Sequence, residues 1–193
     1  RAGDHIRRAG EDAPAGTVLL PQGTRITEWH LGVLASVEQL QVSVARRPVV
    51  SIVSTGDELR EPGSPDRPGS VVDANGYVLA ALVERCGGVA RRLPFAPDDR
   101  EATTSRLNAA LEASDVVLTI GGVSVGEHDV VREAMNDAGI ALDFWKVAIK
   151  PGKPLCLGIA SSGQRVLGLP GNPASATLTF LLFGAPLLRA LQN

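Results

Sequence analysis

Four short polar motifs in this chain combine residue types that can bind a phosphate or another oxyanion. Each directly follows an apolar run and contains glycine or proline beside residues that carry a charge, a hydroxyl or an amide. The motifs are Ser54–Glu58, Gly121–Asp129, Lys150–Pro154 and Pro170–Ser175. Glycines let a ligand approach the backbone, and free N–H groups at the start of a helix attract negative charge. We therefore predict one site for an anionic, phosphate-bearing ligand.

The hydrogen-bond donors and cations of this site come from the last three motifs. The hydroxyls of Ser124 and Ser175 can donate hydrogen bonds, and Asn172 begins a helix whose N–H groups point outward. Lys150 and Lys153 bring two cations within one turn, in a loop stiffened by two prolines. An exposed lysine pair is usually a solvated surface, but the fixed loop favours anion binding here.

Three acidic residues supply the second half of the site. Glu58, Asp98 and Asp129 come from different loops or helix starts, and all can face one crevice. Carboxylates that face bound phosphates usually hold a divalent cation, which offsets the repulsion and polarises the phosphoryl group. We therefore predict Mg²⁺ or another divalent cation. The alternative is that Asp98 only caps its helix and Asp129 lies on an exposed first turn; for Asp57, capping is the preferred interpretation.

The elements that must position these residues alternate between strands and helices. Strands are expected at Val49–Val53, Val89–Phe95, Val116–Ile120, Leu142–Ile149, Leu155–Ile159 and Val166–Leu169. Helices are expected over about 73–86, 98–113 and 127–138, and from Asn172 onward with a break or kink at Pro186. This alternation predicts an α/β fold with a doubly wound, mostly parallel sheet. Ligands bind outside the carboxyl ends of such strands, where the four motifs fall.

Residues 1–46 differ in character from the rest. Turn signals separate short stretches such as His5–Arg8 and Thr17–Leu20, a pattern that predicts small strands of a β-rich accessory piece. A connecting helix is expected over roughly Glu28–Val37. We therefore assign 1–46 to part of a β-rich accessory domain with its connecting helix, and 47–193 to the α/β domain.

Composition excludes several classes of function. Nineteen basic residues face 21 acidic ones, a net charge of −2 that leaves no footprint for duplex nucleic acid or an anionic membrane. No apolar run approaches the roughly 20 residues of a membrane span, and no signal peptide opens the chain, so we expect a cytoplasmic location. The P-loop motif and zinc-ligand histidine spacing are missing. Because the chain starts at Arg1 and ends at Asn193 directly after a predicted helix, we expect a fragment.

Six motifs in a fixed order together carry a family resemblance. They are TGDEL at Thr55–Leu59, DANGYVLAAL at Asp73–Leu82, the pair Asp98-Asp99, GGVSVGEHD at Gly121–Asp129, KPGKP at Lys150–Pro154 and LPGNPASA at Leu169–Ala176. The set closely resembles the molybdopterin molybdenumtransferase family, the bacterial MoeA type related to the E domain of gephyrin. Residues 1–46, especially Gly3–Asp12, resemble the β-rich region that precedes this domain in the family.

The resemblance implies the last step of molybdenum cofactor assembly. Such enzymes bind adenylylated molybdopterin, cleave its pyrophosphate with a divalent cation, and transfer molybdate to the dithiolene with release of AMP. Carried onto matching positions, the acids bind the cation or activate the hydrolytic water, and a second group holds molybdate or phosphate. The acids are Glu58, Asp98 and Asp129; the oxyanion group is Lys150, Lys153 and Ser175; and the phosphate cradle is Gly121, Gly122 and Ser124.

The chain departs from that family at both ends. Family members continue into a C-terminal β-barrel domain and have an extended region before Gly3. Both parts are associated with a homodimer whose cleft is completed across subunits, so we expect the isolated fragment to bind ligand poorly or not to turn over. The resemblance also implies handover between an adenylyltransferase, this protein and molybdoenzymes.

Two rival functions stay open. Molybdopterin adenylyltransferase shares the α/β domain, but it usually carries a GGTG-like loop where this chain has Gly121–Ser124, and it lacks a β-rich piece of this kind. A non-catalytic, gephyrin-like scaffold is the other. The acids and lysines argue against a scaffold, which has no need to retain them together.

Overall fold

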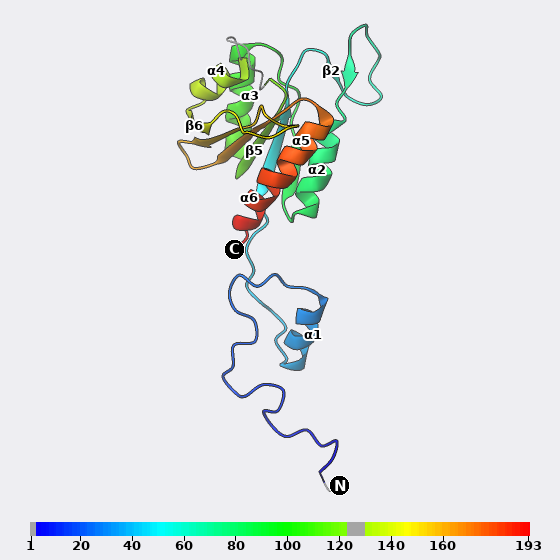
Figure 1. The fold of residues 1–193 in the computed structure, drawn as a ribbon, viewed down its shortest axis with the longest axis vertical. Coiled ribbons are helices and arrows are strands. Elements are labelled where there is room, and N and C mark those ends of the chain that lie inside the picture. The colour runs from blue at the N-terminus through cyan, green and yellow to red at the C-terminus, as the bar shows by residue number, and fades with distance from the viewer. Residues whose placement is uncertain (1–2, 123–129) are drawn as a thin grey trace. The chain divides into compact units, whose positions relative to one another are not determined.

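The computed structural model describes residues 3–122 and 130–193. The chain divides into two compact units, one of residues up to Ala45 together with Asn193, and one of Arg46–Gln192 (Figure 1). Within the described residues, no helix is both long and apolar enough to cross a membrane.

The larger unit is built on a six-stranded sheet in the order β4-β1-β5-β8-β7-β6. Its strands are β1 (Val49–Ser54), β4 (Val89–Arg92), β5 (Val116–Ile120), β6 (Ile140–Phe144), β7 (Cys156–Ala160) and β8 (Arg165–Leu169). The first four in sheet order are parallel; β7 is antiparallel to β8, and β6 is antiparallel to β7. The predicted α/β fold with a mostly parallel sheet is therefore confirmed.

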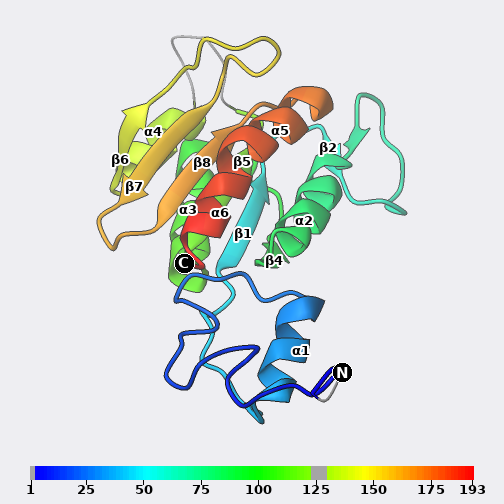
Figure 2. The ribbon, with the colours of Figure 1, turned by 60° about the horizontal axis from the view of Figure 1, so that its bottom comes forward.

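Helices cover both faces of this sheet (Figure 2). They are α2 (Asn75–Arg85), α3 (Arg100–Ala113), α4 (Val130–Asp137), α5 (Pro173–Thr179) and α6 (Ala185–Ala190). One core packs Leu107 of α3 and Met135 of α4 against Val53. The other packs Leu79 of α2 and Phe180 against the opposite face of β1. Because β1 and β5 are buried on both sides, their sequences are mostly apolar, interrupted only by small hydroxyl residues.

The last helix begins where the sequence predicts. The Asn172 side chain accepts a hydrogen bond from the Ser175 N–H at 3.2 Å, and Pro173 occupies the first turn. Instead of breaking at Pro186, the helix passes through a π-helical segment, Phe180–Gly184, before α6. Proline lacks the N–H that a regular helix interior uses, and a π-helical bulge is one of the irregularities by which helices accommodate such a site.

Two predicted strands are shorter than expected. The strand expected over Leu142–Ile149 ends at Phe144, and its pairing with β7 is irregular between Leu142 and Phe144. Pairing resumes between Phe144 and Leu157, and the residues after Phe144 form the connection to β7. The edge strand β4 ends at Arg92, two residues before Pro94, which cannot donate to a ladder.

The smaller unit corrects one expectation. Its helix α1 (Glu28–Ser36) lies where predicted, and the Thr27 N–H at its start donates to His30 Nδ1 at 3.0 Å. Within residues 3–46 the structure contains no strand, so the strands expected at His5–Arg8 and Thr17–Leu20 are wrong. None of the side chains of residues 3–46 is buried, and a strand needs both a partner and a packed face to be stable.

Candidate ligand-binding site

A pocket of the larger unit opens at the carboxyl ends of its parallel strands. It has a volume of about 690 Å³ and collects residues that follow β1, β5 and β8 together with the starts of α2 and α3. Six residues predicted for the site line it: Glu58, Asp98, Gly121, Gly122, Asn172 and Ser175. This position agrees with the rule that open α/β sheets bind ligands beyond the strand ends.

The other predicted residues are not described as part of this pocket. Lys150 and Lys153 are exposed and do not line it, although Pro154 of the same motif does. Their loop connects β6 to β7. Because β6 runs in the same direction as β8, this loop begins at the carboxyl edge of the sheet. Ser124 and Asp129 lie outside the described residues.

The Gly121-Gly122 loop can be formed only without side chains. Gly121 has φ +84° and Gly122 has φ +65°, the left-handed region that favours glycine. A Cβ at Gly121 would lie 3.1 Å from the Thr55 carbonyl oxygen, and one at Gly122 would collide with the Val131 side chain. The Gly121 N–H donates to the Leu169 oxygen at 3.0 Å. The loop therefore brings bare backbone to the pocket and joins the ends of β5 and β8.

Glu58 reaches the pocket from a tight turn after β1. The Leu59 N–H donates to the Gly56 oxygen at 3.2 Å and closes this turn. The side chains of Asp57 and Glu58 are both exposed, so each is free of the desolvation that burial imposes on a charge. Asp57 Oδ1 accepts a hydrogen bond from the Asp98 N–H at 3.3 Å and so joins this turn to the loop that carries Asp98.

The structure decides the capping question for Asp98. The N-cap of α3 is Asp99, whose Oδ1 accepts from the Ala102 N–H at 2.8 Å. The alternative that Asp98 only caps this helix is therefore wrong. Asp98 instead lines the pocket, one residue outside the cap. Two carboxylates, Glu58 and Asp98, thus approach one pocket from separate loops.

Asp73 is a pocket residue whose role sequence reasoning missed. Only 4% of it is exposed, and its carboxylate accepts hydrogen bonds from Ser54 Oγ at 3.0 Å and from the Gly76 N–H at 2.8 Å. It also pairs with Arg92 at 3.2 Å. An Asp followed three residues later by the N–H of a helix is a cap signal that could have found it. Asp73 fixes the start of α2 to the end of β1.

Two further contacts brace the pocket wall formed by α2. Asn75 Nδ2 donates to the Gly171 oxygen at 2.7 Å, which ties the start of α2 to the loop after β8. Arg92 lies 3.7 Å from the centre of the Tyr77 ring and pairs with Glu61 at 2.7 Å. Burial lowers the pKa of Arg92, but hydrogen bonds and charge attraction from Glu61 and Tyr77 outweigh it, so the pKa is raised overall. Arg92 therefore stays a fixed cation behind the pocket.

The carboxylates of the pocket suit a cation that is also coordinated by phosphate oxygens of the ligand. Within residues 3–122 and 130–193, no cluster of three or more His, Cys, Asp or Glu side chains is arranged to hold a metal ion. Mg²⁺ is usually bound by one or two carboxylates plus phosphate oxygens and water, not by an all-protein cage. Glu58 and Asp98, both oxygen donors on one pocket, fit this arrangement.

The fold and the pocket define an α/β domain with a pocket on glycine-rich loops beyond the strand ends. Residues 51–190 match the family described as a probable molybdopterin binding domain, and the chain belongs to this family. Residues 1–38 match the MoeA N-terminal region, described as its domains I and II.

Individual relatives point the same way. The chain is 40% identical to a molybdopterin molybdenumtransferase of Haemophilus influenzae over 98% of its length and 46% of the relative. It is 37% identical to a protein of the same name from Nostoc over 99% of its length and 44% of the relative. A crystal structure of the molybdopterin biosynthesis MoeA protein from Pyrococcus horikoshii has a TM-score of 0.84 at 32% identity, covering 95% of this chain and 45% of that one. The chain thus spans about half the length of these relatives.

Proposed function

We propose that the protein to which this chain belongs is a molybdopterin molybdenumtransferase, which transfers molybdate to adenylylated molybdopterin and releases AMP. One observation carries the proposal: Glu58 and Asp98 reach the same pocket as the bare backbone of Gly121 and Gly122. That combination suits a ligand with adjacent phosphates, and a pyrophosphate-linked pterin nucleotide is such a ligand.

Different residues of the pocket would bind the phosphates and the cation. The backbone at Gly121 and Gly122 approaches the phosphates, and Ser175 with Asn172 offers further polar contacts from the start of α5. Glu58 and Asp98 would hold a divalent cation, which when bound offsets the phosphate charge and polarises the phosphoryl group. Hydrolysis adds water across the pyrophosphate bond, so that AMP leaves and molybdopterin keeps its own phosphate.

The remaining assignments of the proposal rest on the sequence. Asp129 would join the two acids, Ser124 would join the phosphate cradle, and Lys150 with Lys153 would hold molybdate. Mg²⁺ as the cation, a homodimeric full-length protein in the cytoplasm, and handover from an adenylyltransferase and to molybdoenzymes also belong to this proposal. They stay predictions.

The rival activities are supported less well. Molybdopterin adenylyltransferase would use the same α/β domain, but the match of residues 1–38 to the MoeA N-terminal region favours the molybdenumtransferase. A scaffold would have no use for two carboxylates on one pocket beside a glycine loop.

Glu58→Gln in the full-length protein tests the proposal. The variant keeps the shape of the side chain and removes its charge, so AMP release from adenylylated molybdopterin with molybdate and Mg²⁺ should fall roughly 100-fold. Asp66→Asn, at an exposed aspartate outside the pocket, is the matched control and should keep full activity. Undiminished AMP release by Glu58→Gln would contradict the assignment, and ATP-dependent adenylylation of free molybdopterin would favour the rival.

A further inference from the structure

The turn that carries Glu58 is held in place through its carbonyl groups. The turn consists of Gly56–Leu59, and its Asp57 and Glu58 side chains are exposed. All four of its carbonyl oxygens nevertheless accept a hydrogen bond from the protein. Pairing of every carbonyl with a protein donor fixes the backbone position of the turn.

One guanidinium binds the carbonyls on both sides of Glu58. Arg67 Nη2 donates to the oxygen of Asp57 and, at 3.2 Å, to the oxygen of Leu59. The Glu58 oxygen itself accepts from the Val71 N–H at 2.8 Å. Three successive carbonyls are thus fixed from the segment that contains Arg67 and the short strand β3 (Val71–Val72), which pairs in parallel with β2 (Leu59–Arg60).

Arg67 is itself held in place. Its N–H donates to Ser70 Oγ at 3.3 Å, and its carbonyl oxygen accepts from the Ser70 N–H at 2.9 Å. On the opposite side of the turn, the Gly56 N–H donates to the Ala96 oxygen at 3.1 Å. The turn is therefore clamped between the Arg67 segment and the loop that carries the second carboxylate of the pocket.

We infer that Arg67 is a positioning residue for Glu58, acting on the backbone that aims this carboxylate at the pocket. The inference rests on the proposed function for what Glu58 binds, but the clamp can be measured without it. An exposed guanidinium on exposed carbonyls adds little to folding, because water replaces it when it is removed. Removing it should therefore change the order of the turn more than the stability of the domain.

The same segment provides a matched control. Arg60 is a second arginine of the β2–β3 region, half-buried where Arg67 is exposed, and its guanidinium binds Ser70 Oγ and the Ser64 oxygen, both at 3.2 Å. It also pairs with Asp66 at 3.3 Å. These partners all lie outside Gly56–Leu59. Arg60→Met and Arg67→Met thus remove the same charge and the same donors, but only Arg67→Met removes the clamp.

The experiment combines Mn²⁺ binding with amide hydrogen exchange in the full-length protein. Mn²⁺ replaces Mg²⁺ as the probe, and its free concentration is followed by electron paramagnetic resonance. Arg67→Met should weaken Mn²⁺ binding roughly tenfold, as loss of a group that orients a metal ligand does. Arg67→Lys should restore part of the affinity, and Arg60→Met should leave it unchanged. Exchange of the Leu59 amide, which closes the turn, should be faster in Arg67→Met only.

The outcomes separate this inference from the proposed function. Equal loss of Mn²⁺ affinity in Arg60→Met and Arg67→Met, or unchanged Leu59 exchange in Arg67→Met, would overturn the positioning role. Glu58→Gln serves as the reference for the cation. If Glu58→Gln binds Mn²⁺ as tightly as the unaltered protein, the cation role of Glu58 fails, and faster Leu59 exchange in Arg67→Met alone would still support the clamp.

Discussion

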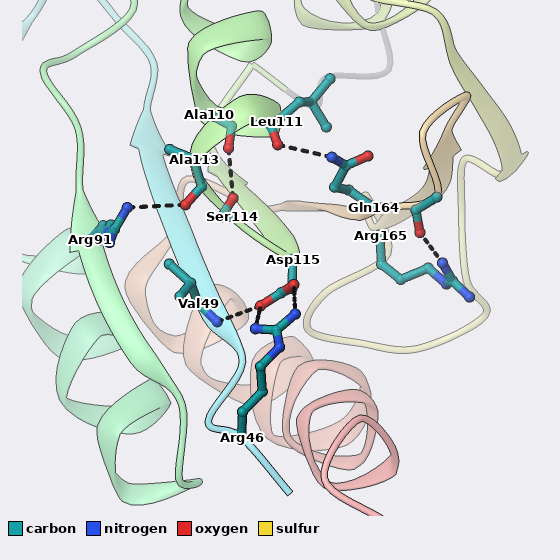
Figure 3. Close-up of polar contacts among 11 residues, drawn as sticks. Arg46, Val49, Arg91, Ala110, Leu111, Ala113, Ser114, Asp115, Gln164 and Arg165 are labelled. Atoms are coloured by element: carbon teal, nitrogen blue, oxygen red, sulfur yellow. Dashed lines mark hydrogen bonds and ion pairs between the residues drawn. The ribbon is translucent and has the colours of Figure 1, made fainter.

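Carboxylates at opposite edges of the central sheet differ in what they face. At the amino edge, Asp115 precedes β5 and binds both Arg46, at 2.7 and 2.5 Å, and the Val49 N–H at 2.8 Å (Figure 3). At the carboxyl edge, Glu58 and Asp98 line an open pocket. A charge that is paired within the protein supports the scaffold, and one that faces a pocket is available to a ligand.

Other polar contacts at the amino edge repeat this pattern. Arg91 donates to the Ala113 oxygen at 3.1 Å and Gln164 donates to the Leu111 oxygen at 3.0 Å, so both bind carbonyls at the end of α3 (Figure 3). The last carbonyls of a helix have no partner within the helix, and these side chains satisfy them. The comparison therefore predicts that removing a paired charge at the amino edge changes stability, whereas removing a charge that faces the pocket at the carboxyl edge changes activity.

The largest effect should come from Asp98→Asn at the carboxyl edge. The substitution keeps the size of the side chain and removes the charge that faces the pocket. On the proposed function, AMP release by the full-length protein should therefore fall roughly 100-fold with an unchanged melting temperature. Asp143→Asn, at an exposed position of β6, is the control and should do neither. A large fall in melting temperature for Asp98→Asn would place this residue with the scaffold and would break the comparison.

Gly122→Ala should have the largest effect on stability at the carboxyl edge. The added Cβ collides with Val131 and must adopt φ +65°, so the free energy of unfolding should fall by about 3 kcal/mol. Urea denaturation followed by circular dichroism measures this. Gly63→Ala provides the control for strain alone, since Gly63 has φ +82° with open space around its Cβ position. Equal losses in the two variants would show that close approach at Gly122 contributes nothing.

Asp115→Ala should lower the free energy of unfolding by about 2 kcal/mol, because it removes charged hydrogen bonds and leaves the Val49 N–H without its acceptor. Activity per folded molecule should stay unchanged. A double-mutant cycle with Arg46→Met separates the ion pair from the backbone contact. If the two substitutions are additive, the Arg46 contact contributes no stability.

The smallest effect concerns acid stability. Hydrogen bonding to Arg46 lowers the pKa of Asp115 below its usual value of 3.8, despite partial burial, which raises it. The stability that this pair contributes is therefore fully present above pH 3.8 and is lost as the pH falls through the lowered pKa. Asp115→Asn should make unfolding less dependent on pH below about 4. An identical acid titration of stability in the variant and the unaltered protein would contradict this prediction.

Much of the fold could be predicted because burial leaves a direct signal in the sequence. The mostly apolar run Val116–Ile120 predicts β5 with its observed bounds, since every one of its side chains is buried. The prediction of a strand at Thr17–Leu20 was wrong because local turn signals do not show whether a segment has a partner strand. The length of β6 was predicted wrongly because it depends on the pairing with β7, which is irregular after Leu142.

The candidate site could be predicted only in part, for a related reason. Glu58 and Gly121 follow recognisable strands, so the topology alone brings them to one edge. The tasks of Arg67 and Asp73 depend on contacts between segments that are separated in the chain, as when Asp73 accepts from Ser54. No local pattern records such contacts, and the choice between Asp98 and Asp99 as helix cap also required the backbone geometry.

The π-helical segment Phe180–Gly184 changes the direction in which the later residues of the last helix face. Ala176 and Leu188 are both buried although twelve residues separate them, and a regular helix of about 3.6 residues per turn would point them about 120° apart. One wide turn absorbs the extra residue and keeps both on the apolar side. The helix therefore accommodates one extra residue at this turn without exposing its apolar face to water.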